Sequence, residues 1–119
     1  MAKTILIVDD EPAQRRLLQA AVERNGFMTR TAENGRQAVD AVDTHADIDA
    51  VMLDLVMPGM SGQEALKEIR QRRSDLPCIV LTASGGIDTV VQAMQAGASD
   101  FFVNPASPER ILCAIRNAL

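Results

Sequence analysis

The sequence contains neither tryptophan nor tyrosine, and aromatic residues make up only 3% of its 119 residues. A hydrophobic core must therefore be built from Val, Ile, Leu, Met and Ala, which suits a sheet covered by helices better than an aromatic recognition surface. Hydrophobic residues amount to 47% of the chain, which is enough for one continuous core at this length. We therefore expect residues 1–119 to form a single domain.

Positive charge does not predominate either, because 16 acidic residues outnumber 12 basic ones and give a formal net charge of -4. Nucleic acids and anionic membranes are bound by clustered positive charge. The sequence therefore predicts no direct binding to nucleic acid and no binding to membranes. A basic partner or another protein is favoured instead.

Cysteine occurs only twice, as Cys78 and Cys113, each beside apolar neighbours and without the spacing of a metal site. We expect both to be buried, reduced thiols. The start of the chain does not resemble a signal peptide, because the apolar run Ile5–Val8 is short and three acids follow it at once. No stretch approaches membrane-spanning length. These features predict a soluble, cytoplasmic protein.

Short apolar runs alternate with longer amphipathic segments along the whole chain, which is typical of a parallel sheet wrapped by helices. The predicted strands are Thr4–Asp9, Phe27–Ala32, Ala50–Asp54, Cys78–Thr82 and Asp100–Val103. Three of them are near-continuous runs of Val, Ile and Leu, as expected of strands buried on both faces. The second is polar enough to lie at an edge. The sequence thus predicts an α/β fold of five strand–helix pairs.

Capping residues mark the predicted helices. The first begins near Pro12 and ends at Asn25-Gly26, the second covers about Gly35–Thr44, and Ser61 with Glu64 forms a capping box for the third. The fourth has an apolar stripe of Ile87, Val90, Val91 and Met94 and can end at Gly97. The last opens at Ser107-Pro108 and places Ile111, Ile115 and Leu119 on one face.

Polar side chains follow three of the predicted strands. Asp9, Asp10 and Glu11 end the first, Asp54 ends the third, and Thr82 ends the fourth. Ligands of open α/β sheets bind outside the carboxyl ends of the strands, and a strand order of 2-1-3-4-5 makes the first and third strands neighbours. Each acid also has a structural interpretation, because Asp10 or Glu11 can cap the next helix and Asp54 can simply end a strand.

Taken together, the acids favour a metal site. Three carboxylates at one edge repel each other, and a hard divalent cation with oxygen ligands keeps them ionised. Mg²⁺ fits because it takes one or two carboxylates, keeps waters and leaves positions for phosphate oxygens. A carboxylate beside such an ion can attack a phosphoryl donor and form an aspartyl phosphate.

Four runs of residues carry a family resemblance across essentially the whole chain. They are ILIVDDEP at 5–12, VMLDLVMPGMSG at 51–62, VLTA at 80–83 and AMQAGASDFFVNP at 93–105. These runs resemble the response regulator receiver family of two-component signalling systems. The stretch from Ser84 to Pro105 further resembles receivers that precede sigma-54-activating transcription modules of the nitrogen-regulator type. The resemblance implies a flavodoxin-like (βα)5 fold, a doubly wound parallel sheet of five strands in the order 2-1-3-4-5.

The resemblance also implies a set of site residues. Asp54 would be the phosphoacceptor and a ligand of Mg²⁺, Asp10 a direct metal ligand, Asp9 a water-mediated one, and the Val56 backbone carbonyl would complete the ion site. Thr82 would hydrogen-bond to the phosphoryl group and Phe101 would be an aromatic switch residue. Without the resemblance, Thr82 is equally well a strand-end hydroxyl and Phe101 a core ring.

The function implied is that of a signalling switch rather than an enzyme. A histidine kinase or phosphotransfer protein would transfer a phosphoryl group to Asp54. The surface of the fourth helix, fifth strand and fifth helix would then change its affinity for an effector domain, an effector protein or a second copy of the chain.

One position departs from the family pattern. Receivers normally carry a lysine before the proline that closes the fifth strand, and this chain has Asn104 there. Neither Lys3 nor Lys67 is well placed to replace that charge, and a solvated helix face is the expected location of Arg15 and Arg16. We therefore hypothesise that metal binding survives while the phosphorylated state is altered in lifetime or in coupling.

The sequence leaves two alternatives to a phosphoacceptor switch. A pseudo-receiver would use the same fold as a constitutive interaction module with Asp54 unmodified. A phosphatase with an aspartyl-phosphate intermediate would need a catalytic lysine beside acids such as Asp9 and Asp10, and none is placed to help. His45 is expected to face solvent at the end of the second helix, outside any site.

Overall fold

A computed structural model describes residues 2–55, 59–82, 87–103 and 107–119. The strands are β1 (Thr4–Val8), β2 (Met28–Ala32), β3 (Ile48–Asp54), β4 (Cys78–Thr82) and β5 (Asp100–Val103). The helices are α1 (Pro12–Arg24), α2 (Gly35–Thr44), α3 (Gly62–Arg72), α4 (Ile87–Gln95) and α5 (Pro108–Ala118). The strands form one parallel sheet in the order β2-β1-β3-β4-β5. The predicted flavodoxin-like order is confirmed.

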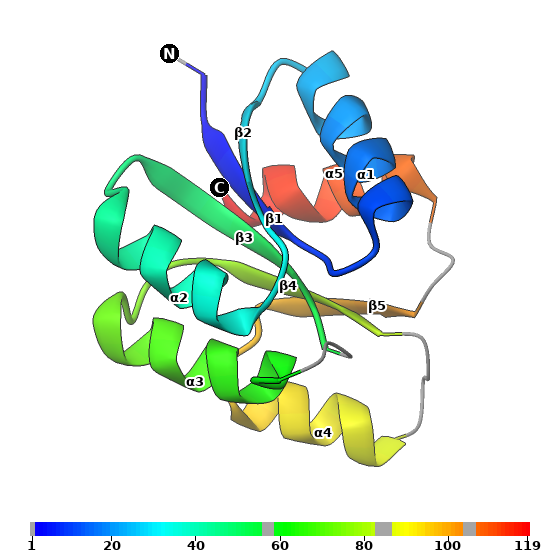
Figure 1. The fold of residues 1–119 in the computed structure, drawn as a ribbon. Helices are drawn as coiled ribbons and strands as arrows, with labels where there is room; N and C mark the ends of the chain where they lie inside the picture. The colour runs from blue at the N-terminus through cyan, green and yellow to red at the C-terminus, as the bar shows by residue number, and fades with distance from the viewer. Residues whose placement is uncertain (1, 56–58, 83–86, 104–106) are drawn as a thin grey trace.

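Helices cover both faces of this sheet, with α1 and α5 on one side and α2, α3 and α4 on the other (Figure 1). The internal strand β1 shows how the sequence achieves this. Ile5 and Ile7 pack under α1 and α5, whereas Leu6 and Val8 pack under the other three helices. All four are at most 1% exposed. An unbroken apolar run is therefore required, because both faces of the strand are buried.

The strand register brings three strand ends to one edge of the sheet. Val8 pairs with Leu53, the residue before Asp54, and Asp54 pairs with Leu81, the residue before Thr82. Residues that immediately follow β1 therefore lie beside the ends of β3 and β4. This is the edge where ligands of open α/β sheets bind.

Several strand boundaries differ from those predicted. β1 ends at Val8 instead of Asp9, β2 begins at Met28 instead of Phe27, and β3 begins at Ile48 instead of Ala50. The acids around Ile48 mark that segment as a loop in the sequence. In the structure Ile48 pairs with Thr4 and is fully buried, so a contact distant in sequence extends the strand.

The orientation of α4 corrects one prediction. Val91 and Met94, assigned to a core-facing stripe, are each 45% exposed, whereas Ala93 is 1% exposed and packs on the sheet. A small side chain on the inner face lets the helix approach the sheet closely, and the bulkier Val91 and Met94 then face outward. Leu119 was likewise expected to share the buried face of Ile111 and Ile115, and it is 42% exposed.

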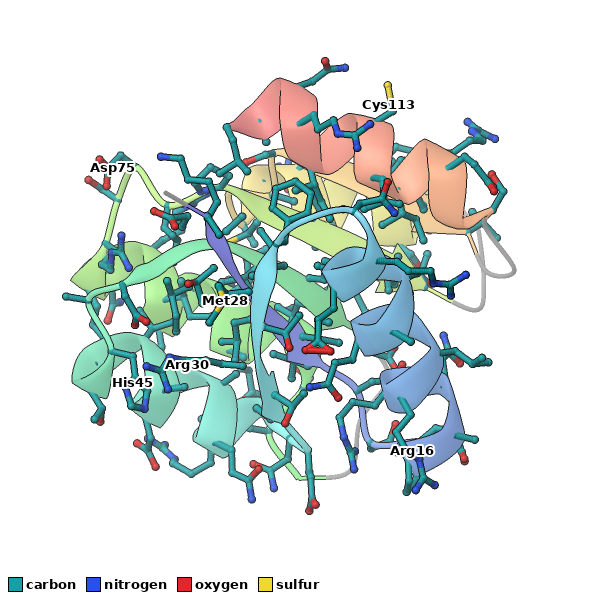
Figure 2. All side chains as sticks on the ribbon, turned by 90° about the horizontal axis from the view of Figure 1, so that it is seen from above. Arg16, Met28, Arg30, His45, Asp75 and Cys113 are labelled. Atoms are coloured by element: carbon teal, nitrogen blue, oxygen red, sulfur yellow. The ribbon has the colours of Figure 1, made fainter. Side chains whose placement is uncertain are left out.

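The two cysteines differ in their environment. Cys78 is buried in β4, as expected, but Cys113 is exposed and projects outward from α5 (Figure 2). Both are free thiols. The apolar neighbours of Cys113 suggested burial, yet Leu112, Ala114 and Ile115 face the sheet and leave residue 113 on the outer side of the helix.

Within the described ranges, no helix combines the length and the apolar composition that crossing a membrane requires.

Candidate functional site

Three carboxylates meet at the edge of the sheet where β1 and β3 end. Asp9 and Asp10 follow β1 directly, and Asp54 is the last residue of β3. One oxygen of each carboxylate lies within 4.8 Å of the other two. Asp9 is buried, Asp54 is half-buried and Asp10 is exposed. The structure thus brings together the acids that the sequence placed at this edge.

Asp9 is the most constrained of the three, being only 1% exposed. Its Oδ1 accepts a hydrogen bond from the Glu11 amide at 2.9 Å, while its buried Oδ2 has no hydrogen-bond partner within the described residues. Burial raises the pKa of the Asp9 carboxyl above its usual value, and the hydrogen bond from Glu11 opposes that rise. A buried carboxylate oxygen without a donor is a costly arrangement that a bound cation would relieve.

The donor set indicates which cation would fit. Every available ligand atom in this group is a carboxylate oxygen, which suits a hard ion such as Mg²⁺. Mg²⁺ keeps several waters when it binds proteins, and the exposed Asp10 leaves the cluster open to solvent. The residues present therefore fit a magnesium ion. Val56, whose carbonyl was expected to complete the site, lies outside the described residues.

The other expected site residues lie on β4 and β5. Thr82 ends β4 next to the end of β3 and is only 2% exposed. Phe101 is half-buried in β5, pairs with Val80 and packs against the core beneath α2, α3 and α4. Asn104, at the position where the family carries lysine, lies outside the described residues.

A recess of about 530 Å³ opens beside Asp10, so the acid cluster is reached directly from solvent. Its other walls belong to the connection between β2 and α2, the first turn of α2 and the residues that precede α3. These residues are Glu33, Asn34, Arg36, Gly59 and Met60.

Arg15 is the residue that the sequence interpretation misplaced. It was expected on a solvated helix face, but its side chain is only 16% exposed. Its Nη1 donates to the backbone carbonyl of Asp9 at 2.8 Å, and its Nη2 lies 3.8 Å from Oε1 of Glu33. Arg16 is exposed, as expected, and points away from the protein (Figure 2). The available signal was position, because helical side chains lean towards the N-terminus and Arg15 lies one turn after Glu11.

Residues 5–116 match the response regulator receiver domain. The chain belongs to this family. Among curated relatives of this receiver, the chemotaxis protein CheY of Bacillus subtilis is 42% identical over 120 residues, covering 100% of the chain and 99% of that protein.

Solved structures of other response regulators share the fold of this receiver. Response regulator protein TrrA from Thermotoga maritima, in complex with Mg²⁺-BeF, is 34% identical with a TM-score of 0.89, covering 98% of the chain and 99% of that structure. NtrX from Brucella abortus is also 34% identical, with a TM-score of 0.92. The likeness to NtrX is consistent with the expected resemblance to sigma-54-activating regulators.

The share of each relative that the receiver covers varies widely. The match to NtrX covers all of this chain but only 27% of NtrX. The chain spans about half the length of several curated relatives that it matches. Many relatives are therefore longer proteins of which the receiver is one part.

Proposed function

We propose that this receiver is a phosphoacceptor switch in which Asp54 takes a phosphoryl group from a phosphohistidine of a histidine kinase or phosphotransfer protein. The observation that carries the proposal is the cluster of Asp9, Asp10 and Asp54 with a buried, unpartnered Oδ2 on Asp9. The complex of TrrA with Mg²⁺-BeF supports it, because a related chain binds magnesium together with beryllium fluoride.

The chemistry falls to Asp54. One of its carboxylate oxygens forms the new bond to phosphorus while the bond from phosphorus to the donor nitrogen breaks, and the leaving imidazole takes up a proton. Bound Mg²⁺ supplies positive charge to the phosphoryl oxygens. Asp9 and Asp10 would hold the ion, and Val56 would add its carbonyl. Because Asp54 is half-buried at the end of a strand, its carboxylate is held beside those of Asp9 and Asp10.

The switch would act through β4 and β5. A phosphoryl group on Asp54 offers strong acceptors to the hydroxyl of Thr82, which ends the adjacent strand. Phe101 would respond to the movement of Thr82 and change the outer surface of α4, β5 and α5. That surface carries exposed apolar side chains at Val91, Met94 and Val103. It would bind an effector domain, an effector protein or a second copy of the chain.

Several broader expectations belong to the same proposal. The chain would act as a signalling module without turning over a substrate, in the cytoplasm, as a single domain over residues 1–119. It would make no direct contact with nucleic acid or membrane. In a longer regulator it would control an effector module, including one that regulates transcription.

Intact mass spectrometry tests the central step. The chain is incubated with Mg²⁺ and acetyl phosphate, alongside Asp54→Ala and the matched control Asp75→Ala, whose exposed carboxylate precedes β4 far from the cluster (Figure 2). We expect one labile phosphoryl adduct that requires Mg²⁺, is absent from Asp54→Ala and persists in Asp75→Ala. No adduct on a chain that still binds Mg²⁺ would contradict the proposal and favour the pseudo-receiver.

A further inference from the structure

Arg15 contacts two segments next to the acid cluster, the loop after β1 and the connection between β2 and α2. It lies in the first turns of α1, and its guanidinium donates to the Asp9 carbonyl at 2.8 Å on one side and lies 3.8 Å from the Glu33 carboxylate on the other. With only 16% of the side chain exposed, it is held in place by its surroundings. The contact to the carbonyl is a charge-assisted hydrogen bond, which is stronger than a neutral one.

The Asp9 carbonyl belongs to the peptide that leads into Asp10. Because the peptide bond is planar, this oxygen, the Asp10 amide and the Asp10 Cα lie in one plane. Fixing the oxygen therefore fixes how the chain enters Asp10. The Asp10 side chain has no hydrogen bond of its own within the described residues, so its direction depends on the backbone. Arg15 holds that backbone.

The Asp9–Asp10 loop needs such a restraint because repulsion between the carboxylates would push them apart. Asp9, Asp10 and Asp54 bring carboxylate oxygens within 4.8 Å of one another, and like charges at this distance repel. Two other hydrogen bonds hold the loop, from the Asp9 amide to the Ala32 carbonyl at 3.2 Å and from the Glu11 amide to Oδ1 of Asp9 at 2.9 Å. Neither of these acts on the peptide that leads into Asp10.

We propose that Arg15 is a positioning residue that presets the Asp9–Asp10 loop for a divalent cation. The inference rests on the proposed function, because it assigns a role to Arg15 in the same metal site. Within the described ranges, Arg15 donates its hydrogen bond to a backbone carbonyl and forms its ion pair with Glu33, outside the acid cluster. It acts on Asp10 through the backbone.

Calorimetric titration of Mg²⁺ into the 119-residue chain tests the inference with three variants. Arg15→Gln removes the charge and the forked donor, Arg15→Lys keeps the charge with a single donor group, and Arg16→Gln is the matched control on the exposed side of α1. We expect Arg15→Gln to weaken Mg²⁺ binding by about tenfold, as is typical for residues that orient metal ligands. Arg15→Lys should fall between this variant and the parent, and Arg16→Gln should match the parent.

A second comparison separates positioning from charge and from simple stability. Asn104→Lys introduced into Arg15→Gln restores one positive charge, at the position where the family carries lysine, but not the hydrogen bond to the Asp9 carbonyl. We expect Mg²⁺ affinity to stay low in this double variant, and urea unfolding without metal to show that each variant remains folded. If Arg15→Gln does not fold, Arg15→Lys carries the test, and parental affinity in that variant overturns the inference.

The remaining outcomes are equally distinct. Parental Mg²⁺ affinity in Arg15→Gln, or full recovery in the double variant, overturns the positioning role while leaving the proposed function intact. An equal loss in Arg16→Gln overturns it as well, because the effect would then be one of net charge. Absence of Mg²⁺ binding by the parent chain overturns the proposed function and the inference together.

Discussion

Gly62 approaches the backbone of Asp54 so closely that a Cβ at residue 62 would lie 2.5 Å from the Asp54 carbonyl oxygen and 2.5 Å from the Leu55 Cα. The Gly62 amide donates to the Leu55 carbonyl at 3.1 Å, which ties the start of α3 to the end of β3. No side chain fits in this space. The end of β3 that carries Asp54 is therefore held against α3 by the absence of a side chain at residue 62.

Gly62→Ala is expected to lower the free energy of unfolding by about 2–4 kcal/mol, because backbone atoms on both sides must move to admit the methyl group. Urea unfolding measures the loss. Gly26→Ala is the matched control, since Gly26 has a φ of 91° but open space around it, and only the backbone cost of about 1–2 kcal/mol applies. A smaller loss in Gly62→Ala than in Gly26→Ala would contradict the packing argument.

Asp9→Asn should stabilise the metal-free chain at neutral pH and abolish Mg²⁺ binding. Burial raises the pKa of Asp9 in the folded state above its ordinary value of 3.8. The stability that this carboxyl provides is therefore fully present below pH 3.8 and is lost as pH rises through the folded value. The neutral amide does not suffer that loss.

Thermal unfolding with and without Mg²⁺ checks this prediction. We expect Asp9→Asn to unfold at a higher temperature than the parent without metal, and Mg²⁺ to stabilise only the parent. Asp75→Asn, a change at an exposed acid, should behave like the parent in both conditions. A metal-free Asp9→Asn chain that is less stable than the parent at neutral pH would show that the charge is not the dominant cost.

Asn104→Lys is expected to change the rate of phosphorylation of Asp54, the lifetime of the phosphoryl group or the structural response. A pair of unit charges near 4 Å contributes up to about 4 kcal/mol before desolvation at an effective dielectric of 20. Time-resolved intact mass spectrometry gives the rates, and amide exchange of α4 and β5 gives the response. Asn117→Lys adds the same charge on the exposed side of α5 and should change neither. Unchanged behaviour in Asn104→Lys would refute the hypothesis.

The two thiols should react at very different rates with iodoacetamide. Burial raises the pKa of Cys78 from 9.0 to about 11, so the native thiol is protonated and shielded, whereas Cys113 is exposed. Mass spectrometry should show one modification in the folded chain, none in Cys113→Ser, and two in urea. Because the unfolded thiol ionises first, stability should also fall as pH rises between 9.0 and about 11. Rapid double modification of the native chain would contradict this.

Local patterns were sufficient to predict most of the elements. A strand buried on both faces must be continuously apolar, which marked the runs now seen as β1, β3 and β4. Capping side chains marked helix starts, and Ser61 and Ser107 accept hydrogen bonds from the amides of Glu64 and Arg110, as expected. The acids at the strand ends were predicted to meet because parallel strands share one carboxyl edge.

The sequence alone thus determined the order of the elements, the strand order through its family resemblance, and the convergence of Asp9, Asp10 and Asp54. Only the tertiary structure decided which of two adjacent arginines turns inward, that Val91 and Met94 of α4 face outward and that Gly62 must lack a side chain. Periodicity shows that a helix has an apolar face but not which neighbour covers it. Contacts between residues distant in sequence settle that question, because close packing leaves room for only one arrangement.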